Sequence, residues 1–277
     1  MTIVRTLMLL VLVTVTGCFP ARRGDPADPG DRITVMTYNI QYGGGGTNLA
    51  GITGAIRAIG PDIVALQEVD VRWSSRSEFA DQAAVIAEAL GMHVRFAPIY
   101  DIPDSAMARP ARQFGVAILS RHPIIRFSNH PQTRHSTQEP SAPPRPQPGL
   151  LEAIIDVRGQ PVRVFNTHLD YRPDPEVRRR QVAEMLDIIG IWNGPMIVFG
   201  DLNAAPDAPE IAPLFARFRD AWPRGADPGF TMPSTAPSRR IDYVLVSDDI
   251  RVARAVVPVT TASDHRPVLL DLIIPRR

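Results

Sequence analysis

Several short apolar segments of this chain each end in a polar residue whose side chain could bind a metal ion, move a proton or hold a phosphate. These side chains are carboxylates, amides and imidazoles, the groups that proteins use for such chemistry. They are Asn39, Glu68, His168, Asp201, Asn203, Asp242, Asp264 and His265. Each of them, taken alone, has a structural explanation as a turn former, a strand-end cap or a buried partner. Their joint presence favours one shared site.

The segment MIVFGDLNAAPDAP, residues 196–209, illustrates the pattern. Its apolar start predicts a buried strand, after which Gly200 could let the backbone turn or pass close to a neighbouring group. Side chains alternate between the two faces of an extended segment, so Asp201 and Asn203 would leave the strand end on the same side. The alternative is that both residues only form the turn before a proline-rich loop.

Apolar runs and helical spacing predict the elements that must position these residues. Predicted strands cover residues 33–40, 62–69, 114–121, 150–159, 161–169, 196–199, 241–247, 250–259 and 267–274. Predicted helices cover residues 48–59, 78–90, 174–190 and 208–217. Residues 128–149 are rich in proline and predict a long loop, which in a compact domain is functional or disordered. Helices interleaved with strands and hairpins indicate a mixed-sheet core with outer helices.

The N-terminus has the layout of a secretory signal, with Arg5 followed by an apolar run from Leu7 to Val15. Small residues precede Cys18, the only cysteine, and this ending resembles the bacterial lipobox, in which the cysteine is lipidated. We therefore expect a signal peptide over residues 1–17, a flexible tether over 18–31 and one domain over 32–277. The alternative is an ordinary cleaved signal with an incidental cysteine.

The composition is that of a soluble globular domain, with 44% apolar and 21% charged residues. The formal net charge is only +1, so the overall charge does not favour nucleic acid as a partner. Apart from the histidines, every basic residue is arginine. The cluster Arg178 to Arg180 lies in a predicted helix and is most simply a solvated face.

Taken together, the motifs TYNI, LQEV, NTHLD, GDLNA, IDYVLV and SDHRP resemble those of the endonuclease/exonuclease/phosphatase superfamily, which includes DNase I. The resemblance extends over residues 33–274. It implies an α/β fold, the DNase I-like four-layer α/β/β/α sandwich of two mixed sheets flanked by helices. It also implies a phosphoester hydrolase.

The resemblance also implies a metal site built on Glu68, the principal metal ligand of the family. Asn39, from the TYNI motif, is expected to offer a further oxygen ligand beside Glu68. Asp264 could add a second contact to the metal or reach it through water. Carboxylate and amide oxygens are the hard ligands that Mg²⁺ accepts while it keeps several waters. The expected cofactor is Mg²⁺, with Mn²⁺ as a substitute.

Roles in phosphoryl transfer follow from the same resemblance. Asp201 matches the general base beside the attacking water, and Asn203 matches the amide that orients the phosphate. His265 matches a phosphate-contacting histidine, and Asp242 matches the carboxylate that favours its imidazolium, although Asp242 could instead pair with Arg239 or Arg240. His168 matches a second histidine that contacts the scissile phosphate or helps the leaving group.

One departure weakens the comparison with DNase I itself. DNase I-type nucleases carry a glutamate just before the ILSR strand, where it partners the histidine matching His168, whereas this chain has Gln113 nearby. A neutral amide can hold an imidazole ring but cannot stabilise its positive charge as a carboxylate can. The hydrolase interpretation does not depend on this residue.

The expected function is therefore hydrolysis of a phosphodiester or phosphomonoester by an activated water, at the bacterial cell envelope. Nuclease, inositol-phosphate and phospholipid substrates all fit the same core residues. Arg134, Arg145 and above all Arg172 could contact an anionic substrate. The lipid anchor predicts a membrane association on the periplasmic or outer-membrane face, and no protein partner is expected for a monomer. The alternative is a non-catalytic surface lipoprotein that uses the fold as a binding module.

Overall fold

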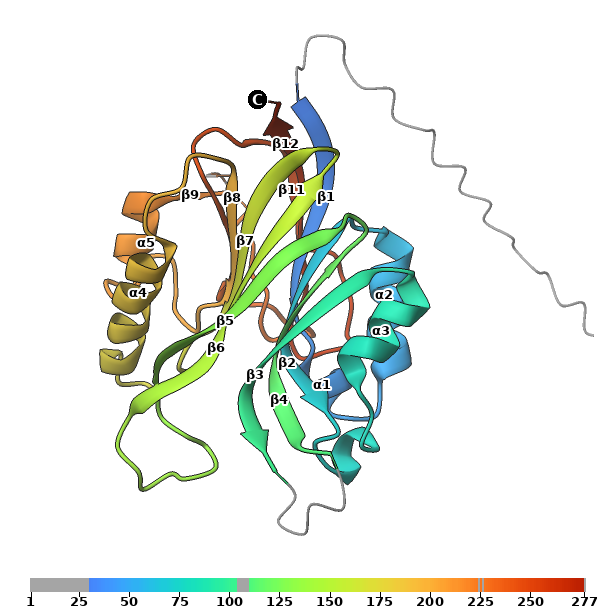
Figure 1. Ribbon diagram of the computed structural model, residues 1–277, viewed down its shortest axis with the longest axis vertical. Coiled ribbons are helices and arrows are strands. Elements are labelled where there is room, and N and C mark those ends of the chain that lie inside the picture. The colour runs from blue at the N-terminus through green and yellow to red at the C-terminus, as the bar shows by residue number, and fades with distance from the viewer. Residues whose placement is uncertain (1–29, 104–109, 224, 226, 277) are drawn as a thin grey trace, which may run out of the picture.

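Two sheets packed face to face, with helices on both outer faces, form the computed structural model of the protein (Figure 1). The structure describes residues 30–103, 110–223, 225 and 227–276. Helices α2 (Leu49–Ile59) and α3 (Gln82–Leu90) cover one sheet, and α4 (Glu176–Ile189) and α5 (Ala212–Arg217) cover the other. This is the expected four-layer α/β/β/α sandwich.

The first sheet contains β1 (Gly30–Asn39), β2 (Ile63–Val71), β3 (His93–Ile102), β4 (Arg112–Ser120), β11 (Arg251–Val256) and β12 (Val268–Pro275). Its strand order is β11-β12-β1-β2-β4-β3. The second sheet contains β5 (Ile124–Arg134), β6 (Arg145–Val157), β7 (Gln160–His168), β8 (Met196–Asp201), β9 (Arg219–Asp220) and β10 (Asp242–Val246). Its strand order is β5-β6-β7-β8-β10-β9. Two short elements complete the described chain: α1 (Gln41–Gly44) and the 3₁₀ turn η1 (Ser75–Ser77).

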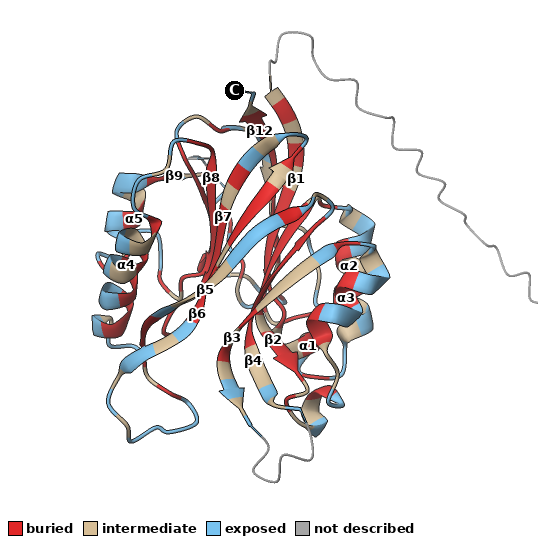
Figure 2. Ribbon diagram, in the orientation of Figure 1, coloured by how far each residue is buried: buried red, intermediate tan, exposed pale blue. Residues whose placement is uncertain are grey.

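The core lies in three layers that follow from the strand and helix patterns. Apolar side chains such as Val35, Ile118 and Phe199 fill the space between the sheets, and separate apolar clusters lie under the two helix pairs. Figure 2 shows buried residues along the central strands and exposed residues on the outer faces of the helices. Burial on both faces explains why the central strands read as continuous apolar runs.

The fold brings the polar strand ends to one place. β1 runs parallel to β2, and Asn39 pairs with Gln67. β7 runs parallel to β8, and His168 pairs with Asp201. β10 runs antiparallel to β8 and begins at Asp242, which also pairs with Asp201. The carboxyl ends of β1, β7 and β8, the middle of β2 and the start of β10 thus converge.

The proline-rich segment is mostly strand, contrary to the predicted loop over 128–149. Its two ends belong to β5 and β6, which pair through Arg134 and Arg145, and only residues 135–144 connect them. β5 is an edge strand, and β6 is paired with β7 only from Leu151 onward. Proline is tolerated in strands that lack a neighbour on one side, which explains the error.

Other elements differ in smaller ways from the prediction. The edge strand β3 was not predicted, and α3 begins later than residue 78 because Glu78 and Phe79 have left-handed backbone angles. β1 begins at Gly30, where it pairs with Pro275, three residues before the strand predicted from residue 33. The expected signal peptide and Cys18 lie outside the described residues. Within the described part of the chain, no helix has the length and apolarity needed to cross a membrane.

The arginine cluster on α4 is not a uniformly solvated face. Arg178 is buried and its guanidinium donates to Glu210 at 2.8 and 3.1 Å. Arg179 and Arg180 are exposed and pair with Glu176, as expected of a surface helix. Arg178 also donates to the carbonyl oxygens of Asp170 and Arg172, so it ties the helix to the loop that follows β7.

Candidate active site

Asp201 lies at the centre of the polar cluster, at the end of β8. Its Oδ2 accepts a hydrogen bond of 3.0 Å from Nδ2 of Asn39, and lies 3.7 Å from Nε2 of His168 and 3.8 Å from Nε2 of His265. Burial and the negative charge of Asp242 raise the pKa of the Asp201 carboxyl, while the two histidines and Asn39 oppose that shift. A buried carboxylate with a raised pKa is a stronger proton acceptor than an exposed one.

The glycine before Asp201 is needed because two strands approach closely there. A Cβ atom at Gly200 would lie 2.6 Å from the carbonyl oxygen of Thr167 on the neighbouring strand. Asn203 follows with a left-handed φ of 49°, and its backbone N–H donates to Oδ1 of Asp201 at 2.9 Å. Its side-chain Nδ2 donates to the carbonyl of Leu169 at 3.0 Å. The hydrogen bonds that form this turn therefore also hold Asp201 and Asn203 in the site.

Glu68 is turned out of β2 by an irregularity in the strand. The register of β2 against β4 shifts between Leu66 and Val69, and Glu68 has a left-handed φ of 55°. A non-glycine residue in this conformation is strained, and such residues cluster at functional sites. Its Oε1 accepts from Nδ2 of Asn39 at 3.1 Å and lies 3.9 Å from Nε2 of His168. One amide group of Asn39 thus holds the Glu68 and Asp201 carboxylates together.

His265 and Asp242 form a buried pair. Nδ1 of His265 lies 2.8 Å from Oδ2 of Asp242, which also accepts from Oγ1 of Thr231 at 2.5 Å. Burial alone would lower the pKa of His265, but the Asp242 carboxylate raises it to about 10. Asp242 does not pair with Arg240, which binds Asp220 instead. The ring is an imidazolium at neutral pH, a donor suited to a phosphate oxygen.

His168 is positioned through its backbone. Nη1 of the buried Arg134 donates to the carbonyl oxygen of His168 at 2.7 Å. Gln113 is engaged elsewhere, because its Oε1 accepts from Nη2 of Arg72 at 3.3 Å. Sequence reasoning identified His168 but not Arg134 as its support, because nothing local in the sequence links these two residues.

Hard oxygen donors suited to a divalent cation surround this centre. Asp201, Asp242 and His265 offer ligand atoms that all lie within 4.8 Å of one another, so this buried cluster could hold a metal ion. Glu68 is a second candidate ligand, because its side chain is 23% exposed and lines the adjoining pocket. Oδ1 of Asn39 accepts from the backbone N–H of Gln41, which leaves its amide hydrogens facing the two carboxylates. Carboxylate pairs of this kind are typical of magnesium sites.

Asp264 lies at the edge of the cluster. It is half-buried, and its Oδ1 lies 3.2 Å from Oγ of Ser263. The same hydroxyl donates to the carbonyl of Asn39 at 2.8 Å, so Ser263 ties the SDHRP loop to the end of β1. Metal ligation by Asp264 and Asn39 stays a prediction.

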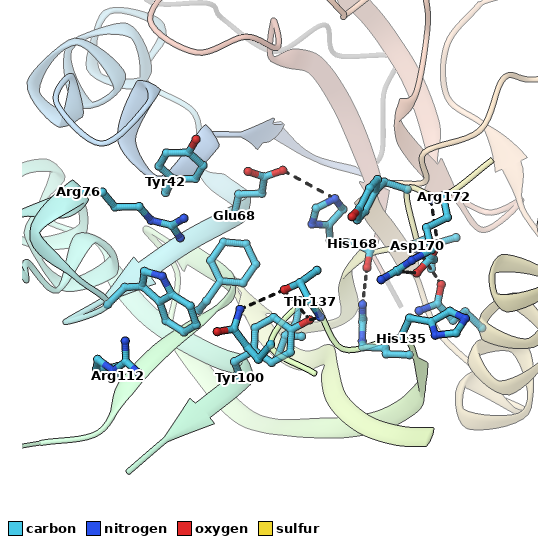
Figure 3. A pocket seen from close by; sticks show the side chains of 18 residues that line it. Tyr42, Glu68, Arg76, Tyr100, Arg112, His135, Thr137, His168, Asp170 and Arg172 are labelled. Carbon is cyan, nitrogen blue, oxygen red and sulfur yellow. Dashed lines mark hydrogen bonds and ion pairs between the residues drawn. The ribbon is translucent and has the colours of Figure 1, made fainter. Parts of the chain in front are cut away.

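A pocket of about 370 Å³ opens beside Glu68 and His168 (Figure 3). Arg172 lines it, as expected of a substrate contact, and binds Asp170 at 2.5 Å. Arg134 also lines it, but two of its nitrogens already donate to neighbours. Arg145 is paired with the exposed Glu139 and is not among the lining residues. The aromatic residues of this pocket were missed because each comes from a different segment.

The chain belongs to the endonuclease/exonuclease/phosphatase family, whose model matches residues 36–265. This family generally hydrolyses phosphoester bonds and is metal-dependent. The sequence-based resemblance is thereby confirmed.

Solved structures agree on the fold. An endonuclease/exonuclease/phosphatase from Beutenbergia cavernae is 28% identical, covering 88% of this chain and 72% of that one with a TM-score of 0.73. A mannosyl-6-phosphatase from Bacteroides thetaiotaomicron is 20% identical (87% and 100% coverage, TM-score 0.67). The human Nocturnin catalytic domain, with bound sulfate, is 22% identical (87% and 93% coverage, TM-score 0.65). The search of curated proteins found no match.

Proposed function

We propose that this protein is a Mg²⁺-dependent phosphoesterase held at the bacterial cell envelope by a lipid on Cys18. The observation that carries the catalytic part is the position of Asp201, a buried carboxylate between Asn39 and two histidines. A structural carboxylate would be neutralised by one firm ion pair, whereas this one faces two imidazoles at 3.7 and 3.8 Å. Both distances exceed hydrogen-bonding range, so neither Nε2 atom is hydrogen-bonded to Asp201.

The roles of the residues follow from their donors and charges. Asp201 accepts a proton from water as the water oxygen bonds to phosphorus, and the bond from phosphorus to the ester oxygen breaks. The His265 imidazolium donates to a nonbridging oxygen, and Asn203 has an amide hydrogen beyond the one given to Leu169. The proposed role of His168 is to protonate or hydrogen-bond the departing oxygen.

Glu68 is the proposed principal ligand of the cation, with Asn39 and Asp264 as further contacts. When bound, Mg²⁺ would neutralise charge on the phosphate oxygens. The alternative cluster of Asp201, Asp242 and His265 is less suited, because a protonated His265 has no lone pair to give.

The experiment compares Mg²⁺-dependent hydrolysis of a generic phosphodiester and a generic phosphomonoester by residues 19–277. The Asp201→Asn variant, which keeps the side-chain shape, is the control. Cleavage of either ester that depends on Mg²⁺ and is lost in the variant supports the proposal. Equal turnover by both proteins contradicts the assignment of Asp201, and no turnover of either ester favours the binding-module alternative.

The envelope location is tested separately on the full-length chain. Cys18→Ser is expected to move the protein from the membrane fraction to the soluble fraction without changing its activity. Persistence in the membrane fraction would contradict the lipid anchor and leave the catalytic proposal unaffected.

A further inference from the structure

A buried polar network lies directly beneath the candidate site, between the two sheets. Asn166 on β7 stands two residues before His168, and the two side chains therefore share a face of the strand. Thr37 on β1 stands in the same relation to Asn39. Gln67 on β2 joins them, because its Nε2 donates to Oδ1 of Asn166 at 2.7 Å and to Oγ1 of Thr37 at 3.0 Å. All three network residues are fully buried, and the reaction at phosphorus uses none of them.

Asn166 occupies a position that is otherwise apolar. Its partners across the second sheet, Leu151 on β6 and Phe199 on β8, both belong to the core between the sheets. A buried amide costs free energy there unless its polar atoms are hydrogen-bonded. Besides the bond to its oxygen, Nδ2 of Asn166 donates to the carbonyl oxygens of Leu66 and Ala117 at 2.9 and 2.8 Å. Every one of these partners lies in the first sheet, so this amide fits one arrangement of that sheet.

The partners of Asn166 surround a bulge in β2. The pairing of β2 with β4 shifts by one residue between Leu66 and Val69. Gln67 and Glu68 therefore lie opposite a single residue of β4. Leu66 and Val69 both pack in the apolar cluster beneath α2 and α3, although residues three apart on a regular strand face opposite sides. The apolar pattern thus requires one extra residue between them, but it does not decide which residue turns toward the site.

We propose that Asn166 is a positioning residue that makes Glu68, and not Gln67, the residue turned into the site. Asn166 binds the Gln67 side chain and the carbonyl oxygen of Leu66, and so holds Gln67 between the sheets. Glu68 is then the extra residue, and its left-handed φ of 55° directs its carboxylate to the amide of Asn39. This inference rests on the proposed function for the metal role of Glu68, but not for its conformation.

The first test is structural and needs neither metal nor substrate. Asn166→Leu keeps a side chain of similar size but removes its donors and its acceptor. Backbone NMR shifts report the conformation of Gln67 and Glu68, and we expect these resonances to move or split in the variant. Val164→Ala is the matched control, because Val164 is an apolar residue on the same face of β7 and should leave both resonances in place. Unchanged Glu68 shifts in Asn166→Leu would overturn the proposal.

The second test measures Mn²⁺ affinity by electron paramagnetic resonance. Asn166→Leu should weaken Mn²⁺ binding roughly tenfold, the usual effect of losing a residue that orients a metal ligand, and Val164→Ala should not. In a Glu68→Gln protein, Asn166→Leu should weaken binding by less than about twofold further, because both substitutions act on the same ligand. Equal weakening with and without Glu68→Gln, or equal weakening by Val164→Ala, would show that Asn166 only stabilises the core and would refute the positioning role.

A second variant keeps the test decisive if Asn166→Leu does not fold. Asn166→Ser is smaller and keeps one hydroxyl, which has a single hydrogen to donate where the amide gives one to each of two carbonyl oxygens. The Gln67 and Glu68 shifts and the Mn²⁺ affinity should change in the same direction as for leucine. Wild-type shifts and affinity in this variant would count against the proposal.

The outcomes also distinguish this inference from the proposed function. If Glu68→Gln leaves Mn²⁺ binding unchanged, the metal role of Glu68 fails, and the NMR comparison alone decides whether Asn166 positions this residue. If Glu68→Gln abolishes Mn²⁺ binding while Asn166→Leu changes neither the shifts nor the affinity, the positioning role fails and the proposed function stands.

Discussion

Nδ1 of His265 lies 2.8 Å from Oδ2 of Asp242, and both side chains are buried. The other carboxylate oxygen of Asp242, Oδ1, is buried and has no hydrogen-bond partner among the described residues. The negative charge of Asp242 is therefore balanced chiefly by the imidazolium. This pairing raises the pKa of His265 to about 10 from its ordinary 6.5.

Asp242→Asn should give the enzyme a new pH dependence. Without the carboxylate charge the pKa of His265 falls, so the variant loses its imidazolium, and with it activity, at a lower pH than the wild type does. The wild type should show no such loss below about pH 9. The measurement is kcat/KM against pH with saturating Mg²⁺, and parallel profiles would contradict the role of Asp242.

The same pair predicts how stability depends on pH. Because the folded-state pKa of His265 is raised above the unfolded value, the pair contributes fully to stability below about pH 6.5 and loses that contribution as the pH rises toward 10. The stability advantage of wild type over Asp242→Asn should therefore shrink across that range. Thermal unfolding at several pH values without metal measures it, and an advantage that grows with pH would refute the pairing.

Arg134 is a positioning residue for His168. It is buried, its pKa is lowered to about 10 by burial, and it donates to the carbonyl oxygen of His168. Arg134→Met should lower kcat about tenfold or more with little change in KM, because the imidazole is displaced while substrate contacts remain. Arg134→Lys should restore part of kcat. A fall in melting temperature with unchanged kcat would show a purely structural role.

The two candidate metal centres can be separated by binding measurements. Glu68→Gln should weaken Mn²⁺ binding at least about tenfold, because it replaces a charged ligand with a neutral one. Asp264→Asn should have a smaller effect. Equilibrium binding followed by electron paramagnetic resonance gives the affinities. If His265→Ala weakens binding more than Glu68→Gln does, the ion lies instead among Asp201, Asp242 and His265.

The ion pair between Arg178 and Glu210 should matter far more than its neighbours on α4. Arg178→Ala leaves a buried carboxylate unpaired and should cost about 3 kcal/mol of unfolding free energy. Arg180→Ala, which removes an exposed pair with Glu176, should cost less than about 0.5 kcal/mol. Denaturant unfolding measures both. Equal costs would mean that the buried pair contributes no more than the exposed one.

Strands and helices could be predicted from the sequence wherever an apolar run or a helical spacing of apolar residues was clear. The apolar run before Asp201 and the strand that ends at His168 formed as expected, because a strand buried on both faces needs little but apolar side chains. The edge strands β3 and β5 escaped prediction. Pro98 and Pro131 lie within them, and a sequence does not state which strands will lack a neighbour.

The sequence by itself determined the reactive groups, their order and the strands that carry them, because residue type and hydrophobic pattern are local properties. Only the tertiary structure decided that Asn39 joins Glu68 to Asp201, or that Arg134 supports His168. It also decided that Trp73, Tyr100 and Phe114 share one pocket. These relationships depend on strand order and register across two sheets. Such pairings arise from packing between segments distant in the chain, and no local pattern encodes them.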